Sequence, residues 1–126
     1  PNSGTILLAE DDILVQQSIV HKLKRLGFEV IAVGSAKEAL AALEVRSDFT
    51  LLLSDVMMPG QMTGAELARE VLRRWPNIRV LLSSGYTESS IGTKVDIPPG
   101  VRLLSKPYSA TDLKQALAET LNHMSD

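Results

Sequence analysis

The chain has 126 residues, which is the length of one domain, and its composition excludes several classes of protein. A hydrophobic fraction of 44% and a charged fraction of 22% are typical of folded globular proteins, so a mainly disordered chain is not expected. A net charge of −2 argues against a basic nucleic-acid-binding surface, and the absence of cysteine excludes disulfides and thiolate chemistry.

Short apolar segments alternate with helical segments, beginning at residue 5. The continuous apolar run 5–9 predicts a buried strand. Residues 13–26 carry an apolar stripe at helical spacing, and Gly27 follows as a typical residue after a helix end. Residues 28–33 form the second expected strand.

The same alternation continues to the end of the chain. The pair Ser35 and Glu38 has the spacing of a capping box and opens the next helix. The remaining expected elements are strands at 50–54, 78–83 and 101–104, helices at 64–75 and 87–95, the second of them short, and a last helix opened by Ser109.

Strands that alternate with helices form parallel sheets through right-handed crossovers. We therefore predict an α/β, flavodoxin-like three-layer sandwich with a five-stranded parallel sheet in the order 2-1-3-4-5 and five helices. The domain is expected to span 1–126 with its core at about 5–121. Because the chain begins at Pro1 and not at Met, we expect a fragment of a longer protein. In such sheets, sites form outside the carboxyl ends of the strands.

Polar residues follow four of the five expected strands. They are Glu10, Asp11 and Asp12 after the first strand, Asp55 after the third, Ser83 and Ser84 at the fourth, and Ser105 and Lys106 after the fifth. The predicted topology makes these strands neighbours, so the side chains should converge. Alone, each motif is an ordinary turn or helix cap; together, in this order, they indicate a site.

The charges of this group predict a metal ion. Two carboxylates about 5 Å apart repel by roughly 3 kcal/mol at an effective dielectric constant of about 20. Lys106 supplies only one positive charge, so a hard divalent cation such as Mg²⁺ is expected. With the acids neutralised, Asp55 becomes a candidate nucleophile toward phosphorus, and Lys106 and Ser84 could stabilise the phosphoryl oxygens.

The stretches ILLAEDD, LLLSDVMMPG, VLLSSGY and LLSKPY carry a family likeness. The sequence resembles the receiver domain of two-component response regulators over about residues 5–121. The resemblance implies that Asp55 is the phospho-acceptor, that Ser84 and Lys106 contact the phosphoryl group, and that Lys106–Pro107 is a cis peptide bond. It also implies a Mg²⁺ site, with the ligands Asp11, Asp12, Asp55 and the backbone carbonyl of Met57.

The chain departs from the usual receiver pattern at three places. The loop MPGQMTG is one residue longer than usual, which resembles the receivers of hybrid histidine kinases. Leu103 occupies a position that often holds a switch aromatic, and Ser84 replaces the more frequent Thr. The polar segment 87–100 is expected to open at low free energy and to respond to Ser84.

The favoured function is a signalling switch that takes a phosphoryl group from a phosphohistidine onto Asp55. The expected partners are a histidine kinase or a histidine phosphotransfer domain, in the cytoplasm, with no nucleic acid and no membrane contact; a weak homodimer stays open. Turnover is expected to be limited to self-phosphorylation and autodephosphorylation.

Three alternatives compete with this function. A metal-dependent aspartyl-phosphate phosphohydrolase would carry a second Asp two residues after the nucleophile, where this chain has Met57. A flavin-binding protein would need a phosphate cradle after the first strand, and the acids there would repel phosphate. A non-phosphorylated interaction module would not require the complete set of site residues.

Overall fold

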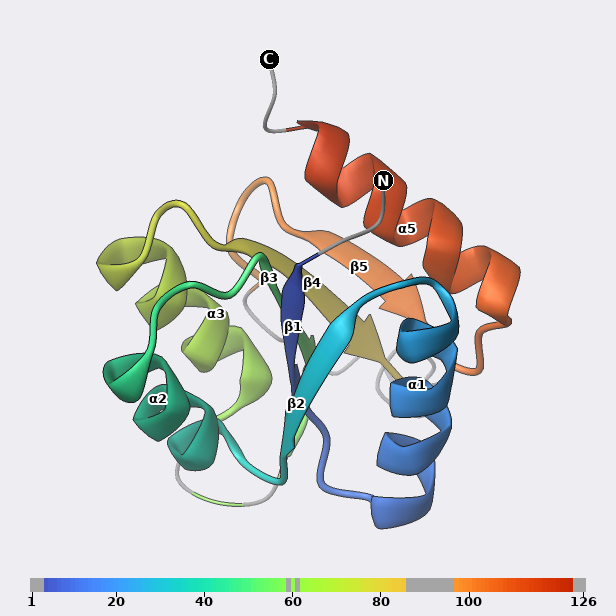
Figure 1. Cartoon of the computed structure of the whole chain (residues 1–126). Helices are drawn as coiled ribbons and strands as arrows, with labels where there is room; N and C mark the ends of the chain where they lie inside the picture. Colours follow the sequence, from blue (N-terminus) through green and yellow to red (C-terminus); the bar gives the residue numbers. More distant parts are fainter. Residues whose placement is uncertain (1–3, 59, 61, 86–96, 124–126) are drawn as a thin grey trace.

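A computed structural model describes residues 4–58, 60, 62–85 and 97–123. Within these residues the chain forms a five-stranded sheet with helices on both faces (Figure 1). The strands are β1 (Thr5–Ala9), β2 (Glu29–Val33), β3 (Leu51–Asp55), β4 (Arg79–Ser84) and β5 (Arg102–Ser105). The helices in the described part are α1 (Ile13–Arg25), α2 (Ala36–Val45), α3 (Gly64–Arg74) and α5 (Ala110–His123).

The sheet has the strand order β2-β1-β3-β4-β5, and every neighbouring pair is parallel. This order confirms the topology predicted from the alternation of strands and helices. Each observed strand begins and ends within one residue of its predicted position. Four of the five expected helices are present; the short helix expected at 87–95 lies outside the described residues.

Apolar side chains cover both faces of the central strands and form two core clusters. On one face, side chains that include Leu7, Leu52 and Leu82 pack under α2 and α3. On the other, side chains that include Leu8 and Leu53 pack under α1 and α5. Complete burial of one leucine side chain stabilises the fold by about 1.5–3 kcal/mol. Burial on both faces explains why these strands are continuous apolar runs rather than alternating ones.

Polar caps begin the helices at the edge of the sheet where the strands end. The hydroxyl of Ser35 accepts a hydrogen bond from the N–H of Glu38 at 3.1 Å, as the sequence predicts. The carboxylate of Glu38 accepts from the N–H of Gly34 rather than from that of Ser35, so the second half of this capping box is displaced by one residue. Reciprocal capping boxes open α3 with Thr63 and Glu66 and α5 with Ser109 and Asp112.

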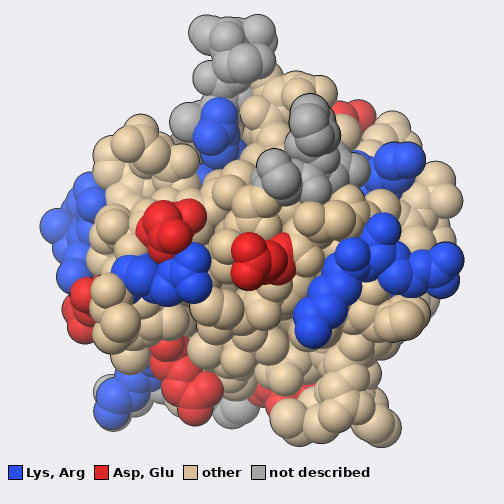
Figure 2. Space-filling view, viewed as in Figure 1, with Lys and Arg blue, Asp and Glu red and all other residues tan. Residues whose placement is uncertain are grey.

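Charged side chains of both signs are interspersed on the surface. On the face shown in Figure 2, Lys and Arg form several separate groups with Asp and Glu between them. This distribution agrees with the small net charge of −2. No helix in the described ranges combines the length and the apolar character that crossing a membrane requires.

Candidate functional site

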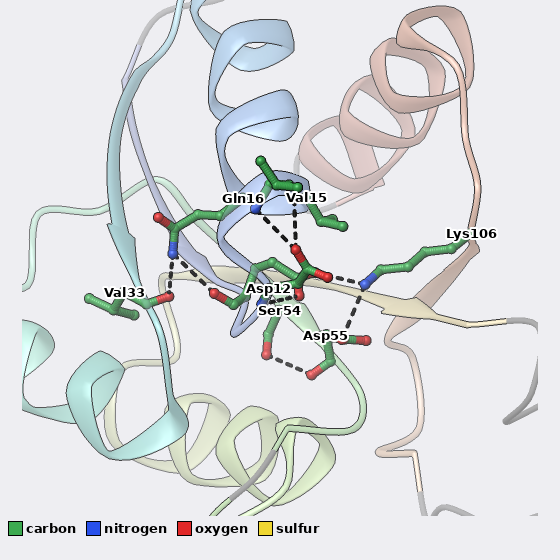
Figure 3. A network of polar contacts seen from close by, with 9 residues as sticks. Asp12, Val15, Gln16, Val33, Ser54, Asp55 and Lys106 are labelled. Carbon is green, nitrogen blue, oxygen red and sulfur yellow. Dashed lines mark hydrogen bonds and ion pairs between the residues drawn. The ribbon is translucent and has the colours of Figure 1, made fainter.

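Side chains from three strand ends meet at the carboxyl edge of the sheet (Figure 3). The Lys106 ammonium, just after β5, donates to Glu10 Oε1 at 2.7 Å and to Asp55 Oδ2 at 3.1 Å. Glu10 follows β1 and is 2% exposed, and Asp55 ends β3 and is 8% exposed. The fold therefore brings together two nearly buried carboxylates and one ammonium that are far apart in the sequence.

The ammonium of Lys106 is held in its charged form. Burial alone would lower its pKa, but the hydrogen bond to Glu10 and the negative charges of Asp55 and Glu10 outweigh burial, so the pKa of Lys106 is raised. At neutral pH this lysine is a permanent cation between the two acids. It offsets part of their mutual repulsion.

Three carboxylates of this edge form a compact group of oxygen atoms. Glu10, Asp11 and Asp55 each offer one oxygen, and these atoms all lie within 4.8 Å of one another. Asp11 is exposed, whereas the other two are buried, so the group opens to solvent on the side of Asp11. Exposure of one acid leaves a path by which an ion or a phosphoryl group could arrive.

The side chain of Asp12, which the resemblance implies to be a metal ligand, faces the start of α1 in this structure. Its Oδ1 accepts from the N–H groups of Leu14 at 3.0 Å and Val15 at 3.2 Å, so the side chain caps the first turn of α1. The compact group of acids contains Glu10 in its place. The physical reason is that the first free N–H groups of a helix need an acceptor, and Asp12 is the residue just before α1.

The different surroundings of Asp11 and Asp12 predict different effects of their removal. Asp12→Ala should lower the free energy of unfolding by about 1 kcal/mol, because a helix loses its cap. Asp11→Ala should leave stability unchanged or raise it, because one repelling charge leaves the acidic group, and should abolish Mg²⁺ binding. Urea denaturation and a Mg²⁺ titration followed by NMR measure both effects. Loss of Mg²⁺ binding in Asp12→Ala would restore Asp12 as a ligand.

Two further residues expected at the site are Ser84, at the end of the strand between β3 and β5, and Met57, two residues after Asp55. Ser84 ends β4 and is 6% exposed; its hydroxyl is 3.4 Å from the carbonyl oxygen of Gly85, and its own carbonyl accepts from the N–H of Lys106 at 2.7 Å. Met57 is 39% exposed. The backbone of Ser84 therefore anchors the residue that carries the ammonium.

The backbone of Asp55 is fixed by two small residues that sequence reasoning did not single out. The hydroxyl of Ser54, which is fully buried, donates to the carbonyl oxygen of Asp55 at 2.9 Å (Figure 3). Gly64, the first residue of α3, lies so close that a Cβ atom there would overlap the same carbonyl oxygen. The only sequence signal was a lone hydroxyl in an apolar strand and a glycine at a helix start.

Several residues near Lys106 bear on what the sequence led us to expect. The Lys106–Pro107 peptide bond is cis, as the resemblance implies. Leu103 is 46% exposed on the edge strand β5. Burial, followed by the negative charges of Glu10 and Asp55, raises the pKa of Tyr108, so its phenol stays neutral. Tyr86 and most of the segment 87–100 lie outside the described residues.

Lys106→Met is expected to destabilise the protein at neutral pH by about 1–3 kcal/mol, because buried acceptors on Glu10 and Asp55 lose their donor. The effect should shrink above pH 10.5, the ordinary pKa of lysine. A group whose pKa is raised on folding contributes fully below its unfolded pKa, and the contribution is lost as pH rises through the folded value. Urea denaturation at neutral pH and above pH 10.5 measures the change. Lys114→Met, at an exposed position, is the control. An equal loss of stability in the two variants would show that the bonds of Lys106 to Glu10 and Asp55 do not stabilise the fold.

Comparisons with known proteins agree with the resemblance seen in the sequence. The profile of the response regulator receiver domain matches residues 6–118. The chain is 32% identical over 116 residues to the response regulator receiver protein CpdR of Brucella abortus (strain 2308), with 92% of this chain and 95% of that protein covered. It is also 32% identical over 120 residues to the sensor kinase CckA of the same organism, where 94% of this chain covers 13% of the kinase.

Solved structures show the same architecture. A response regulator receiver protein from Sinorhizobium medicae WSM419 is 26% identical and superposes with a TM-score of 0.81 over 95% of each chain. A receiver domain protein from Clostridium thermocellum superposes with a TM-score of 0.82 over 97% of each chain, at 24% identity, and supports the fold alone. Together with the matched profile, which spans most of the sequence, these findings place the chain in the family of response regulator receiver domains, the signalling modules of two-component systems.

Proposed function

We propose that Asp55 is the residue that accepts a phosphoryl group in this receiver domain. The observation that carries the proposal is the position of its carboxylate: at the end of β3, 8% exposed, 3.1 Å from the ammonium of Lys106 and next to two further acids. A nucleophile toward phosphorus needs such a cationic neighbour, because the incoming phosphoryl group is itself negative.

The proposed step is a transfer between two proteins. A carboxylate oxygen of Asp55 forms a bond to phosphorus while the phosphorus–nitrogen bond of a phosphohistidine breaks. The electron pair of that bond stays on the imidazole nitrogen, and the product is an aspartyl phosphate. Lys106 and the Ser84 hydroxyl, which lie at the neighbouring strand ends, would donate to the phosphoryl oxygens.

The acidic group fits a hard divalent cation such as Mg²⁺. Its donors are all oxygen, and three carboxylates with one ammonium leave a net charge of −3 + 1 = −2. Glu10, Asp11 and Asp55 would hold the ion, with the backbone carbonyl of Met57 as a further ligand, while Asp12 serves as the helix cap. The bound ion would supply positive charge against the acids and the phosphoryl oxygens.

The proposed donor is a phosphohistidine on a histidine kinase or a histidine phosphotransfer domain. Receiver domains act with such partners, and both a receiver protein and a sensor kinase are among the relatives of this chain. The chain spans 13% of the length of that kinase. We propose that it is the receiver of a hybrid kinase, and the longer loop MPGQMTG supports this proposal. A cytoplasmic location follows from the same proposal.

The experiment that tests this function measures both transfer and turnover. The chain is incubated with Mg²⁺ and phosphoramidate, a small donor with the same phosphorus–nitrogen bond. We expect one phosphoryl group per chain by intact-mass measurement, located at Asp55 by fragmentation, and slow release of inorganic phosphate. Rapid, continuous release with many turnovers per chain would favour the phosphohydrolase, and no incorporation would favour the interaction module.

A further inference from the structure

Gln16, the fourth residue of α1, connects the ends of the neighbouring strands β1 and β2 through hydrogen bonds of its side chain. Its side-chain Nε2 donates to the carbonyl oxygen of Glu10 at 3.0 Å and to that of Val33, the last residue of β2, at 3.2 Å (Figure 3). A primary amide has two N–H groups, so one side chain can supply both bonds. Gln16 therefore links the start of α1 to the ends of β1 and β2, next to the acidic group that begins at Glu10.

These bonds complete the main-chain pairing of Glu10. Its N–H donates to the carbonyl oxygen of Val33 at 3.0 Å, and its own carbonyl oxygen is the first acceptor of Gln16. Both polar groups of the Glu10 peptide are thus bonded, although the residue lies one position beyond the end of β1. Without Gln16 the Glu10 carbonyl would lose the partner that continues the pairing beyond the strand.

The fixed main chain determines where the Glu10 carboxylate lies. Oε1 accepts from the Lys106 ammonium at 2.7 Å, and Oε2 accepts from the N–H of Asp12 at 3.1 Å. With 2% exposure, the side chain has little free space in which to take another position. A change in the Glu10 backbone would therefore move an oxygen of the acidic group and the partner of Lys106.

We infer that Gln16 is a positioning residue: by bonding the carbonyl oxygens of Glu10 and Val33, it holds the Glu10 carboxylate in the group that also contains Asp11 and Asp55. It does not itself touch the proposed ion or the phosphoryl group. The expected effect on Mg²⁺ affinity rests on the proposed function. The positioning of the Glu10 carboxylate concerns the protein without metal.

The test compares two methionine variants of neighbouring glutamines. Gln16→Met keeps the length of the side chain and removes both donors. Gln17→Met, at an exposed position on the same helix, is the matched control. Amide hydrogen exchange is measured without metal, with Leu8 inside β1 as the internal reference for overall unfolding, and Mg²⁺ affinity is then measured by NMR titration.

We expect exchange at the amides of Glu10 and Asp12 to become about tenfold faster in Gln16→Met, relative to Leu8, and to stay within about twofold of the parent in Gln17→Met. Mg²⁺ affinity should fall by about tenfold in Gln16→Met alone, as is usual when a residue behind a metal ligand is removed.

Two results would overturn the inference. One is unchanged exchange at Glu10 and Asp12 in Gln16→Met, and the other is parental Mg²⁺ affinity in that variant. A parent protein that binds no Mg²⁺ would instead refute the metal part of the proposed function, and the exchange comparison would still decide whether Gln16 positions Glu10.

Discussion

Asp55→Asn is expected to abolish incorporation of the phosphoryl group. An amide oxygen is a poor nucleophile and cannot form an acyl phosphate, so the chemical step has no acceptor. The variant should nevertheless fold, because the amide oxygen can still accept a hydrogen bond from Lys106 and one negative charge leaves a group of repelling acids. Intact mass after incubation with phosphoramidate and Mg²⁺ measures the loss.

The control for this variant is a second aspartate outside the site. Asp48→Asn changes an exposed carboxylate that pairs with Arg46, and it should incorporate the phosphoryl group as the parent does. A beryllofluoride titration followed by NMR checks the same acceptor without covalent transfer. Persistent incorporation in Asp55→Asn, at any residue, would refute Asp55 as the acceptor.

The fold was largely predictable because each strand is a short apolar run between turn signals. Runs such as 5–9 and 50–54 must be buried on both faces, and only a sheet covered by helices on both sides provides this. The strand order followed from the handedness of parallel crossovers and the usual doubly wound arrangement. Boundaries shifted by one residue where polar side chains such as Asp55 end a strand.

The site was predictable to the level of strand ends but not of individual contacts. Convergence of Asp55 and Lys106 follows from topology alone, and the ion pair at 3.1 Å agrees with it. Glu10, Asp11 and Asp12 are consecutive acids, and the sequence does not show which of them point toward Asp55. The start of α1 decides it, because the residue before the helix is drawn to the free N–H groups.

The supporting residues were missed for a physical reason. Gln16 and Ser54 act through hydrogen bonds to backbone carbonyls, and any sequence offers many candidate donors for such bonds. Only the three-dimensional arrangement shows which carbonyl lies within reach. The spacing of residues in a sequence shows which of them share a helix face or a strand end. It does not show that a side chain such as Gln16 on one helix reaches the carbonyl oxygens of two strands.

Gly64→Ala is expected to cause the largest loss of stability among single-methyl changes near the site. A Cβ at this position would overlap the carbonyl oxygen of Asp55 and approach the Ser54 hydroxyl to 3.0 Å. Both are held within the buried β3 strand, so relief requires a shift of α3 or of the strand end. We expect the free energy of unfolding to fall by about 3 kcal/mol, at the upper end for an overpacked site.

The same variant should slow phosphoryl transfer to Asp55, since the overlapped atom belongs to the acceptor itself and a movement of the strand end displaces its carboxylate relative to Lys106. Gly34→Ala is the matched control: a Cβ there meets only the Glu38 carboxylate, at 3.7 Å, which is an ordinary contact. Its stability should stay within about 0.5 kcal/mol of the parent. Urea denaturation and the rate of incorporation from phosphoramidate measure both effects. Parental stability and rate in Gly64→Ala would mean that the start of α3 yields freely, and that the close packing of Gly64 does not fix the position of Asp55.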